Sequence, residues 1–445
     1  MTTWHAEWAW LGDAGIAGDV LLEAVDGVLA RVEVGVPAPV DAVRLPGVTL
    51  PGLVNAHSHA FHRALRGRTH HGAADFWAWR DRMYAVAAQL DPDRYHALAR
   101  ACFAEMATAG ITAVGEFHYL HHGPDGVPYA DPNVMAEALR AAATAAGIRL
   151  TLLDTLYLRS GFDGRPLHPV QRRFRDADAD RWGERVDALV FEWDRDPMAR
   201  VGAAIHSVRA VDTEGGKAVA AFAEQRGLPL HMHVSEQEAE NDACVEAHGC
   251  SPLELLASAG ALGPRSTAVH ATHVTTVDVG LLAAHNTTVC LCPTTERDLA
   301  DGIGPARELA ARGVPLALGS DSHAVIDLFE EARTAELHER LTSGRRAGLR
   351  AEALLTAATV GGAASLGWPE TGVLAAGRLA DFVTVGLDSL RLAGTSSADL
   401  AAALVFVAGA ADVTDVVVAG RPVVRSGEHC LVPDPRGELA AAVAL

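Results

Sequence analysis

Three histidines stand close together in the segment "LVNAHSHAFHRALRG" (residues 53–67): His57, His59 and His62. An apolar run, "GVTLPGLV", precedes them, which indicates that they follow a buried strand. Side chains two positions apart on a strand point to the same side, so His57 and His59 project together. Two imidazoles on one side form half of a site for a divalent metal such as zinc.

Four more residues with metal or proton chemistry follow other apolar runs. "LPLHMHVSE" places His233 three positions before Glu236, "STAVHATH" contains His270, and "VPLALGSDSH" contains Asp321. Each residue alone has a structural explanation, as a core histidine, a first-turn helix acid or a helix N-cap. Because all of them follow strand-like runs, together they indicate one metal site with groups beside it that can transfer protons.

The elements that must position these residues alternate between short apolar runs and helical stretches. Eight such runs are present: "GVTLPGLVNAHSH", "ITAVGEFHY", "IRLTLLDTLY", "RVGAAIHSVR", "LPLHMHVSE", "STAVHATH", "TTVCLCPTTE" and "VPLALGSDSH". Ala- and Leu-rich stretches of helical periodicity separate them, several closed by a glycine that suits a helix C-terminus. The pattern predicts a (β/α)₈ barrel over residues 51–369, with the polar residues at the catalytic ends of its strands.

The two ends of the chain have a different pattern. Residues 1–50 and 370–445 contain short alternating segments with glycine-bearing turns, such as "DVLLEAVDGVLARVEV" and "VTDVVVAGRPVVRSGEH". We expect them to pair into one small β-sandwich domain beside the barrel. The alternative is two unrelated terminal extensions.

Composition limits the possible partners and the compartment. The formal net charge of −19 argues against nucleic acid and anionic membranes as partners. The 6 cysteines form no C-x-x-C pair, which favours reduced thiols. The N-terminal "MTTWHAEWAWLGD" lacks the features of a signal peptide, and the longest apolar run, "AAALVFVAGAA", is too short to cross a bilayer. The sequence therefore predicts a cytoplasmic protein.

The set of strand-end residues resembles the amidohydrolase superfamily, in its mononuclear deaminase branch. "LPGLVNAHSH" and "GRLADFVTV" are similar to the segments that join barrel and β-sandwich in that family. The resemblance implies that His57, His59, His233 and Asp321 hold one divalent metal, with zinc as the expected ion. It also implies that Glu236 passes a proton from a metal-activated water to the departing nitrogen. His270 and Asp321 are the other expected catalytic residues, and His270 is in some members a ligand.

A single metal is favoured over two. Binuclear members of the family bridge their metals with a carboxylated lysine at the end of the fourth strand. Here that strand ends in "AIHSVR", with His206 and no lysine, and Lys217 lies beyond it in an apparently helical segment.

Further motifs resemble the members of this branch that hydrolyse N-formimidoyl-L-glutamate to N-formyl-L-glutamate and ammonia. These motifs are "NAHSHAFHRALRG", "FWAWRDRMY", "GEFHYLHH", "IHSVRAV" and "HVSEQ". The resemblance implies a dicarboxylate substrate, a homodimer, and substrate-carboxylate contacts from Arg80, Tyr119, His206 and Arg209. Arginine suits this role because its guanidinium binds carboxylates bidentately. The chain departs from the pattern at His62, which replaces an expected glutamine facing the substrate.

Two alternatives stay open at this point. A deaminase of the same branch acting on a nucleobase, a pterin or a related ring would share the metal residues and lack the paired arginines. A barrel that binds metal without catalysis would not need Glu236, whose presence with the whole set argues against it.

Overall fold

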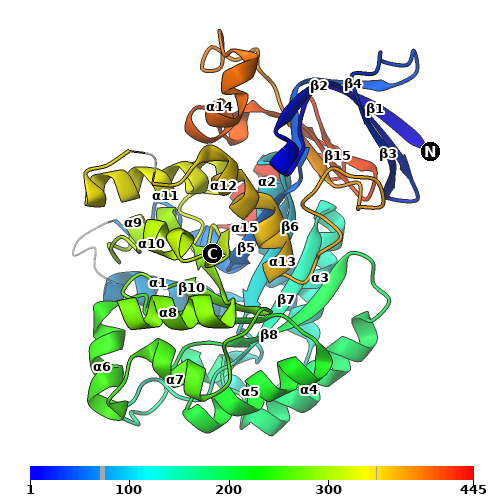
Figure 1. The fold of residues 1–445 in the computed structure, drawn as a ribbon. Coiled ribbons are helices and arrows are strands. Elements are labelled where there is room, and N and C mark those ends of the chain that lie inside the picture. Colours follow the sequence, from blue (N-terminus) through cyan, green and yellow to red (C-terminus); the bar gives the residue numbers. More distant parts are fainter. Residues whose placement is uncertain (71–75, 347, 445) are drawn as a thin grey trace.

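The chain folds into two eight-stranded sheets with helices packed around one of them (Figure 1). The structure is a computed structural model, and it describes residues 1–70, 76–346 and 348–444. One sheet is a parallel barrel, and the other combines strands from both ends of the chain. In Figure 1 the first strands (blue) lie in the same part of the molecule as β15 (red, Arg421–Arg425).

The barrel confirms the predicted (β/α)₈ fold, because its eight strands follow one another in space in chain order. The strands are β5 (Leu53–Ser58), β6 (Ile111–His118), β7 (Arg149–Leu156), β8 (Ala199–Ile205), β9 (Leu230–Val234), β10 (Ser266–His270), β11 (Thr288–Leu291) and β12 (Leu316–Leu318). The helices between and after them are α1 (Phe76–Gln89), α2 (Pro92–Thr108), α3 (Val134–Ala146), α4 (Ala179–Trp193), α5 (Thr213–Arg226), α6 (Glu238–His248), α7 (Pro252–Ser258), α8 (Thr276–His285), α9 (Pro293–Asp298), α10 (Ala306–Ala311), α11 (Leu328–Ser343), α12 (Ala351–Thr356) and α13 (Gly362–Ser365).

The barrel strands are rich in apolar residues and almost wholly buried because both of their faces are covered. Every residue of β7 is buried, one face toward the barrel interior and the other toward the helices. The helices end as their sequences predict. Helix α3 stops at Gly147, which adopts the left-handed conformation with φ +78°.

The barrel closes between its first and last strands at a seam made by few hydrogen bonds. The backbone of Asp321 donates to His57 at 3.0 Å, and His59 donates back to Asp321 at 3.2 Å. Beside them the Asn55 amide donates to Ser320 Oγ at 2.7 Å and accepts from the Ser320 backbone N–H at 2.9 Å. Residues that end the first and last strands are thus held together by the seam itself.

The flanking sheet confirms that the two termini pair. Its strand order is β16-β15-β14-β13-β4-β1-β2-β3. The strands are β1 (Thr2–Trp10), β2 (Ile16–Val25), β3 (Val28–Val34), β4 (Val43–Pro51), β13 (Phe382–Val385), β14 (Val413–Val418), β15 (Arg421–Arg425) and β16 (Glu428–His429). A separate apolar cluster packs on this sheet, and in it the rings of Trp4 and Phe382 meet edge to face at 5.1 Å.

The run "GVTLPGLVNAHSH", expected to be one strand, forms two. Residues Val43–Pro51 join the flanking sheet as β4, and the barrel begins after Gly52 with β5. A side chain at Gly52 would collide with Thr112 Oγ1, so only glycine lets the chain pass from one sheet to the other here. The buried ion pair of Arg149 Nε with Asp381 Oδ2, at 2.6 Å, also links the barrel to the flanking sheet.

The C-terminal region contains two helices that the sequence pattern did not predict. They are α14 (Leu400–Phe406) and α15 (Pro435–Ala442). Helix α15 packs against α2, where Glu438 pairs with Arg100 at 2.5 Å. Within the described part of the chain, no helix is both long and apolar enough to cross a membrane.

Candidate active site

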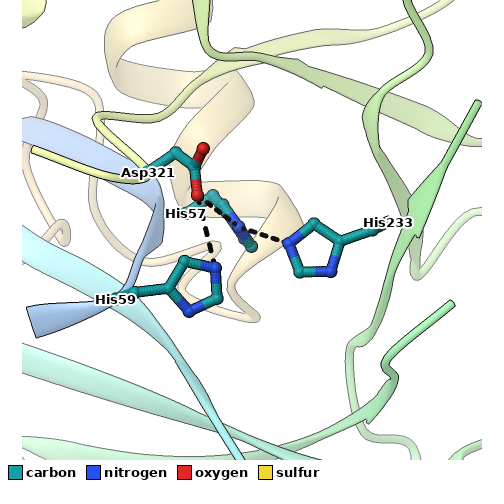
Figure 2. Close-up of side chains that lie close together, drawn as sticks. All are labelled: His57, His59, His233 and Asp321. Atoms are coloured by element: carbon teal, nitrogen blue, oxygen red, sulfur yellow. Dashed lines mark hydrogen bonds and ion pairs between the residues drawn. The ribbon is translucent and has the colours of Figure 1, made fainter. Parts of the chain in front are cut away.

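Four of the predicted metal ligands meet at the ends of three barrel strands. His57 lies on β5, His59 follows it, His233 lies on β9, and Asp321 follows β12. One ligand atom from each lies within 4.8 Å of all the others. Both His57 Nε2 and His59 Nε2 are 3.3 Å from Asp321 Oδ1, and the side chains converge on one point in Figure 2.

The protonation states of His57 and Asp321 fit a divalent cation. Burial lowers the pKa of His57 to about 3, so its imidazole is neutral. Burial favours the neutral form of Asp321, but the imidazoles of His57 and His59, each 3.3 Å away, hold its pKa well below the usual range. Neutral imidazoles with an ionised carboxylate are the donor set that zinc prefers.

Backbone carbonyls orient two of the histidines toward the same point. His59 Nδ1 lies 3.1 Å from the Phe117 carbonyl, and His233 Nδ1 lies 2.9 Å from the His206 carbonyl. Each ring therefore carries its proton on Nδ1 and turns the lone pair of Nε2 inward. The Nε2 atoms of His57 and His233 face each other at 3.1 Å, an arrangement that a shared cation stabilises.

The predicted proton-transfer residues lie directly beside this group. Glu236 Oε1 is 3.8 Å from His270 Nε2, and that nitrogen is 3.9 Å from Asp321 Oδ2. Burial by itself would lower the pKa of His270, yet the carboxylates of Glu236, Asp321 and Glu296 raise it well above the ordinary value. Glu296 lies on α9, with Oε1 3.4 Å from His270 Nδ1, and the sequence analysis did not single it out.

Three turns at the site adopt a left-handed backbone without glycine. The φ angles are +51° at Ser235, +71° at His270 and +42° at Asp321. Such residues are strained and persist only where the surrounding contacts hold them. Here the His273 N–H donates to the Ser235 carbonyl at 2.9 Å, and the Asp321 N–H to the His57 carbonyl at 3.0 Å. The strain therefore coincides with the strand ends that carry the proposed chemistry.

A row of polar and aromatic side chains, which we call the wall, lies beside the metal group and consists of His62, Tyr119, His206 and Tyr157. His62 Nε2 lies 3.1 Å from Tyr119 Oη, and the ring of Tyr119 lies 5.4 Å from that of His206. His206 in turn lies 4.8 Å from the ring of Tyr157 and 5.4 Å from that of His233. The structure thus brings His62, Tyr119 and His206 together beside the metal group.

Two arginines complete this wall. Arg209, on the loop after β8, lies 4.0 Å from Glu236 Oε2 through Nη2. Arg80, on α1, lies with its guanidinium carbon 5.5 Å from the centre of the Tyr84 ring. Burial raises the pKa of Tyr84, and the charges of Arg80 and Arg209 both lower it, so the two cations lie within electrostatic reach of the same side chain. Arg82, the other arginine of "WAWRDRM", is exposed.

A second group with metal-ligand geometry lies on the outer face of the barrel: His118, His121 and Asp154. The buried guanidinium of Arg185 pairs with both oxygens of Asp154, at 2.7 and 2.9 Å. An arginine in that position repels a metal cation and occupies the carboxylate. We therefore interpret this group as part of a structural ionic network.

Lys217 lies away from the site. It is on α5, half exposed, and pairs with Glu214 at 2.8 Å. No lysine stands on β8 or in the loop after it.

The chain belongs to the amidohydrolase family, whose profile matches residues 48–423. It is 39% identical to formimidoylglutamate deiminase of Pseudomonas aeruginosa over 93% of both chains, and 32% identical to 8-oxoguanine deaminase of the same species, covering 82% of this chain and 80% of that enzyme. The fold superposes on an amidohydrolase of Brucella melitensis with a TM-score of 0.92 at 35% identity, covering 100% and 99% of the two chains.

An adenosine deaminase of Xanthomonas campestris with bound zinc superposes with a TM-score of 0.86 at 26% identity, covering 100% of this chain and 99% of that one. The family and these relatives define the chain as a hydrolase of carbon–nitrogen bonds with a His and Asp group suited to a metal ion.

Proposed function

We propose that the protein hydrolyses N-formimidoyl-L-glutamate with one molecule of water to N-formyl-L-glutamate and ammonia, a step of histidine degradation. The observation that carries the proposal is its 39% identity, over 93% of both chains, to formimidoylglutamate deiminase of Pseudomonas aeruginosa. Arg209, which lies 4.0 Å from Glu236, and Arg80 support it, because a substrate with two carboxylates needs cations in its binding site.

One divalent ion, most simply zinc, would be held by His57, His59, His233 and Asp321. Such an ion lowers the pKa of water toward ~7 and so supplies a nucleophile at neutral pH. Glu236 would accept a proton from that water and deliver it to the departing nitrogen, which leaves as ammonia only when protonated. His270, whose pKa the carboxylates of Glu236, Glu296 and Asp321 raise, would donate a hydrogen bond to the attacking oxygen.

The substrate carboxylates would lie against Arg80 and Arg209, with hydroxyl and imidazole donors from Tyr119 and His206. His62 takes the place of the glutamine expected from the resemblance and lies 3.1 Å from Tyr119. A neutral imidazole still offers one donor and one acceptor, so it supports the Tyr119 hydroxyl as an amide would.

The test is ammonia release from N-formimidoyl-L-glutamate by the purified protein with a measured zinc content. We expect turnover that scales with zinc, up to one ion per chain. 8-Oxoguanine and 5′-deoxyadenosine serve as comparison substrates, since deaminases of such rings are among the relatives. Turnover of a ring substrate with none of formimidoylglutamate would replace this proposal by the ring-deaminase alternative. The homodimer and the cytoplasmic location stay predictions. Light scattering, which measures the molar mass in solution, tests the homodimer.

A further inference from the structure

Arg209 lies between two carboxylates that come from one segment of the chain. Its Nη2 is 4.0 Å from Glu236 Oε2, and its Nε is 3.6 Å from Glu240 Oε2. Glu236 precedes α6, and Glu240 lies on the first turn of that helix. The guanidinium is therefore drawn toward the proposed proton-transfer residue on one side and toward a second acid on the other.

The side chain of Glu240 is buried and does not serve to solvate the protein surface. Only 2% of the residue is exposed, whereas Glu238 on the same helical turn has 83% of its side chain in solvent. Acids in the first turn of a helix are common because they interact favourably with its dipole, but that interaction does not require burial. A buried carboxylate is costly unless a cation or hydrogen bonds compensate it, and Arg209 is the cation that faces this one.

The pair is not closed by hydrogen bonds. Arg209 Nε and both carboxylate oxygens of Glu240 are buried, and no hydrogen bond joins these two side chains. The contact at 3.6 Å is thus an ion pair that holds the guanidinium by its Nε side. The Nη1 and Nη2 edge can also bind a carboxylate bidentately, and the contact through Nε leaves this edge available to a substrate.

We propose that Glu240 is a positioning residue for substrate recognition: it holds Arg209 ready for a substrate carboxylate and keeps it from closing onto Glu236. This inference rests on the proposed function, which makes Arg209 a carboxylate ligand and Glu236 the proton carrier. Without Glu240, Glu236 is the nearest remaining carboxylate, at 4.0 Å, and Arg209 pairs with it in the free enzyme. Substrate must then break that pair before it binds, so the loss falls on KM.

The test is a double-mutant cycle of Glu240→Gln and Arg209→Ala, with KM and kcat measured for N-formimidoyl-L-glutamate. Glu240→Gln should raise KM roughly tenfold and leave kcat within about twofold. In the Arg209→Ala background the same change should leave KM as it is, because the partner through which it acts is gone. Glu238→Gln, on the same turn and exposed, is the matched control with wild-type KM.

Other outcomes overturn the inference. If the two substitutions raise KM by factors that multiply in the double variant, Glu240 does not act through Arg209. A reduced melting temperature with unchanged KM would show that it only stabilises α6. If Glu240→Gln does not fold, Glu240→Asp keeps the charge at a greater distance and should raise KM by a smaller factor; an unchanged KM there also refutes the inference.

Binding of glutarate, measured by calorimetry, separates this inference from the proposed function. Wild-type protein that neither turns over formimidoylglutamate nor binds glutarate overturns both. If the wild-type protein turns over formimidoylglutamate and binds glutarate, and the Glu240→Gln variant has the same KM and the same glutarate affinity, only the role of Glu240 is overturned.

Discussion

Replacing Glu236 by glutamine should lower kcat and KM together. The substitution keeps the size of the side chain and removes a carboxylate that lies 3.8 Å from His270 Nε2 and 4.0 Å from Arg209 Nη2. A positioned acid or base contributes roughly 10²- to 10⁴-fold to a rate, so we expect kcat to fall by about that factor. None of the proposed metal ligands changes, so the zinc content should stay at the wild-type level.

The KM effect follows from charge. A substrate carboxylate bound to Arg209 would lie roughly 8 Å from the Glu236 carboxylate, where two like charges repel by about 1–2 kcal/mol at an effective dielectric constant of roughly 20–40. Removing the Glu236 charge should therefore tighten substrate binding by about 5- to 30-fold.

Initial rates from a coupled ammonia assay give kcat and KM, and elemental analysis gives zinc; Glu238→Gln is the control. A zinc-loaded Glu236→Gln protein with kcat within tenfold of wild type would show that the proton moves by another route.

Three further predictions concern recognition, metal and pH. Arg209→Ala should raise KM for formimidoylglutamate roughly 10- to 150-fold, the equivalent of ~1.5–3 kcal/mol of charge-assisted hydrogen bonds, and steady-state kinetics with an unchanged KM would place the carboxylates elsewhere. His57→Asn should abolish zinc retention after gel filtration and with it activity, whereas retained zinc would remove His57 from the ligand set. Burial raises the pKa of Glu116 from 4.5 to about 8. Between these pH values the folded state keeps a proton that the unfolded state has lost. The contribution of Glu116 to the free energy of unfolding therefore falls as pH rises. Glu116→Gln should flatten that part of the pH dependence in urea titrations at pH 5 and 8, and an unaltered slope would contradict the assignment.

The barrel and its metal group were predictable because each produces a pattern within a short stretch of sequence. An apolar β-branched run marks a strand, and a histidine or acid directly after it marks the catalytic end. His57, His59, His233, Glu236 and Asp321 all follow such runs, and the structure brings them together. The flanking sheet was predictable in kind from alternation and glycine-bearing turns.

What the sequence could not predict depends on contacts between distant segments. Glu240 and Glu296 look like ordinary first-turn helix acids, and only burial against Arg209 and His270 distinguishes them. The apolar run divides into β4 and β5 at Gly52, where the distant residue Thr112 leaves no room for a side chain. Among the histidines of "EFHYLHH", His121 proved to be buried against Thr155 in the outer layer of the barrel, at 3.0 Å from its carbonyl.

The seam that closes the barrel has a consequence for how the protein is made. Asn55 and Ser320, which pair across the seam, stand 265 positions apart, and Thr49 and Thr384, which pair in the flanking sheet, stand 335 apart. A ribosome adding about 5–20 residues per second needs tens of seconds to pass from the first residue of such a pair to the second. During that interval the nascent chain carries His57 and His59 without Asp321, and β4 without its partner β13. A metal ion met during this interval therefore finds only part of the ligand set, and the set is complete only once Asp321 has been added. Both long-range closures wait for the C-terminal half of the chain.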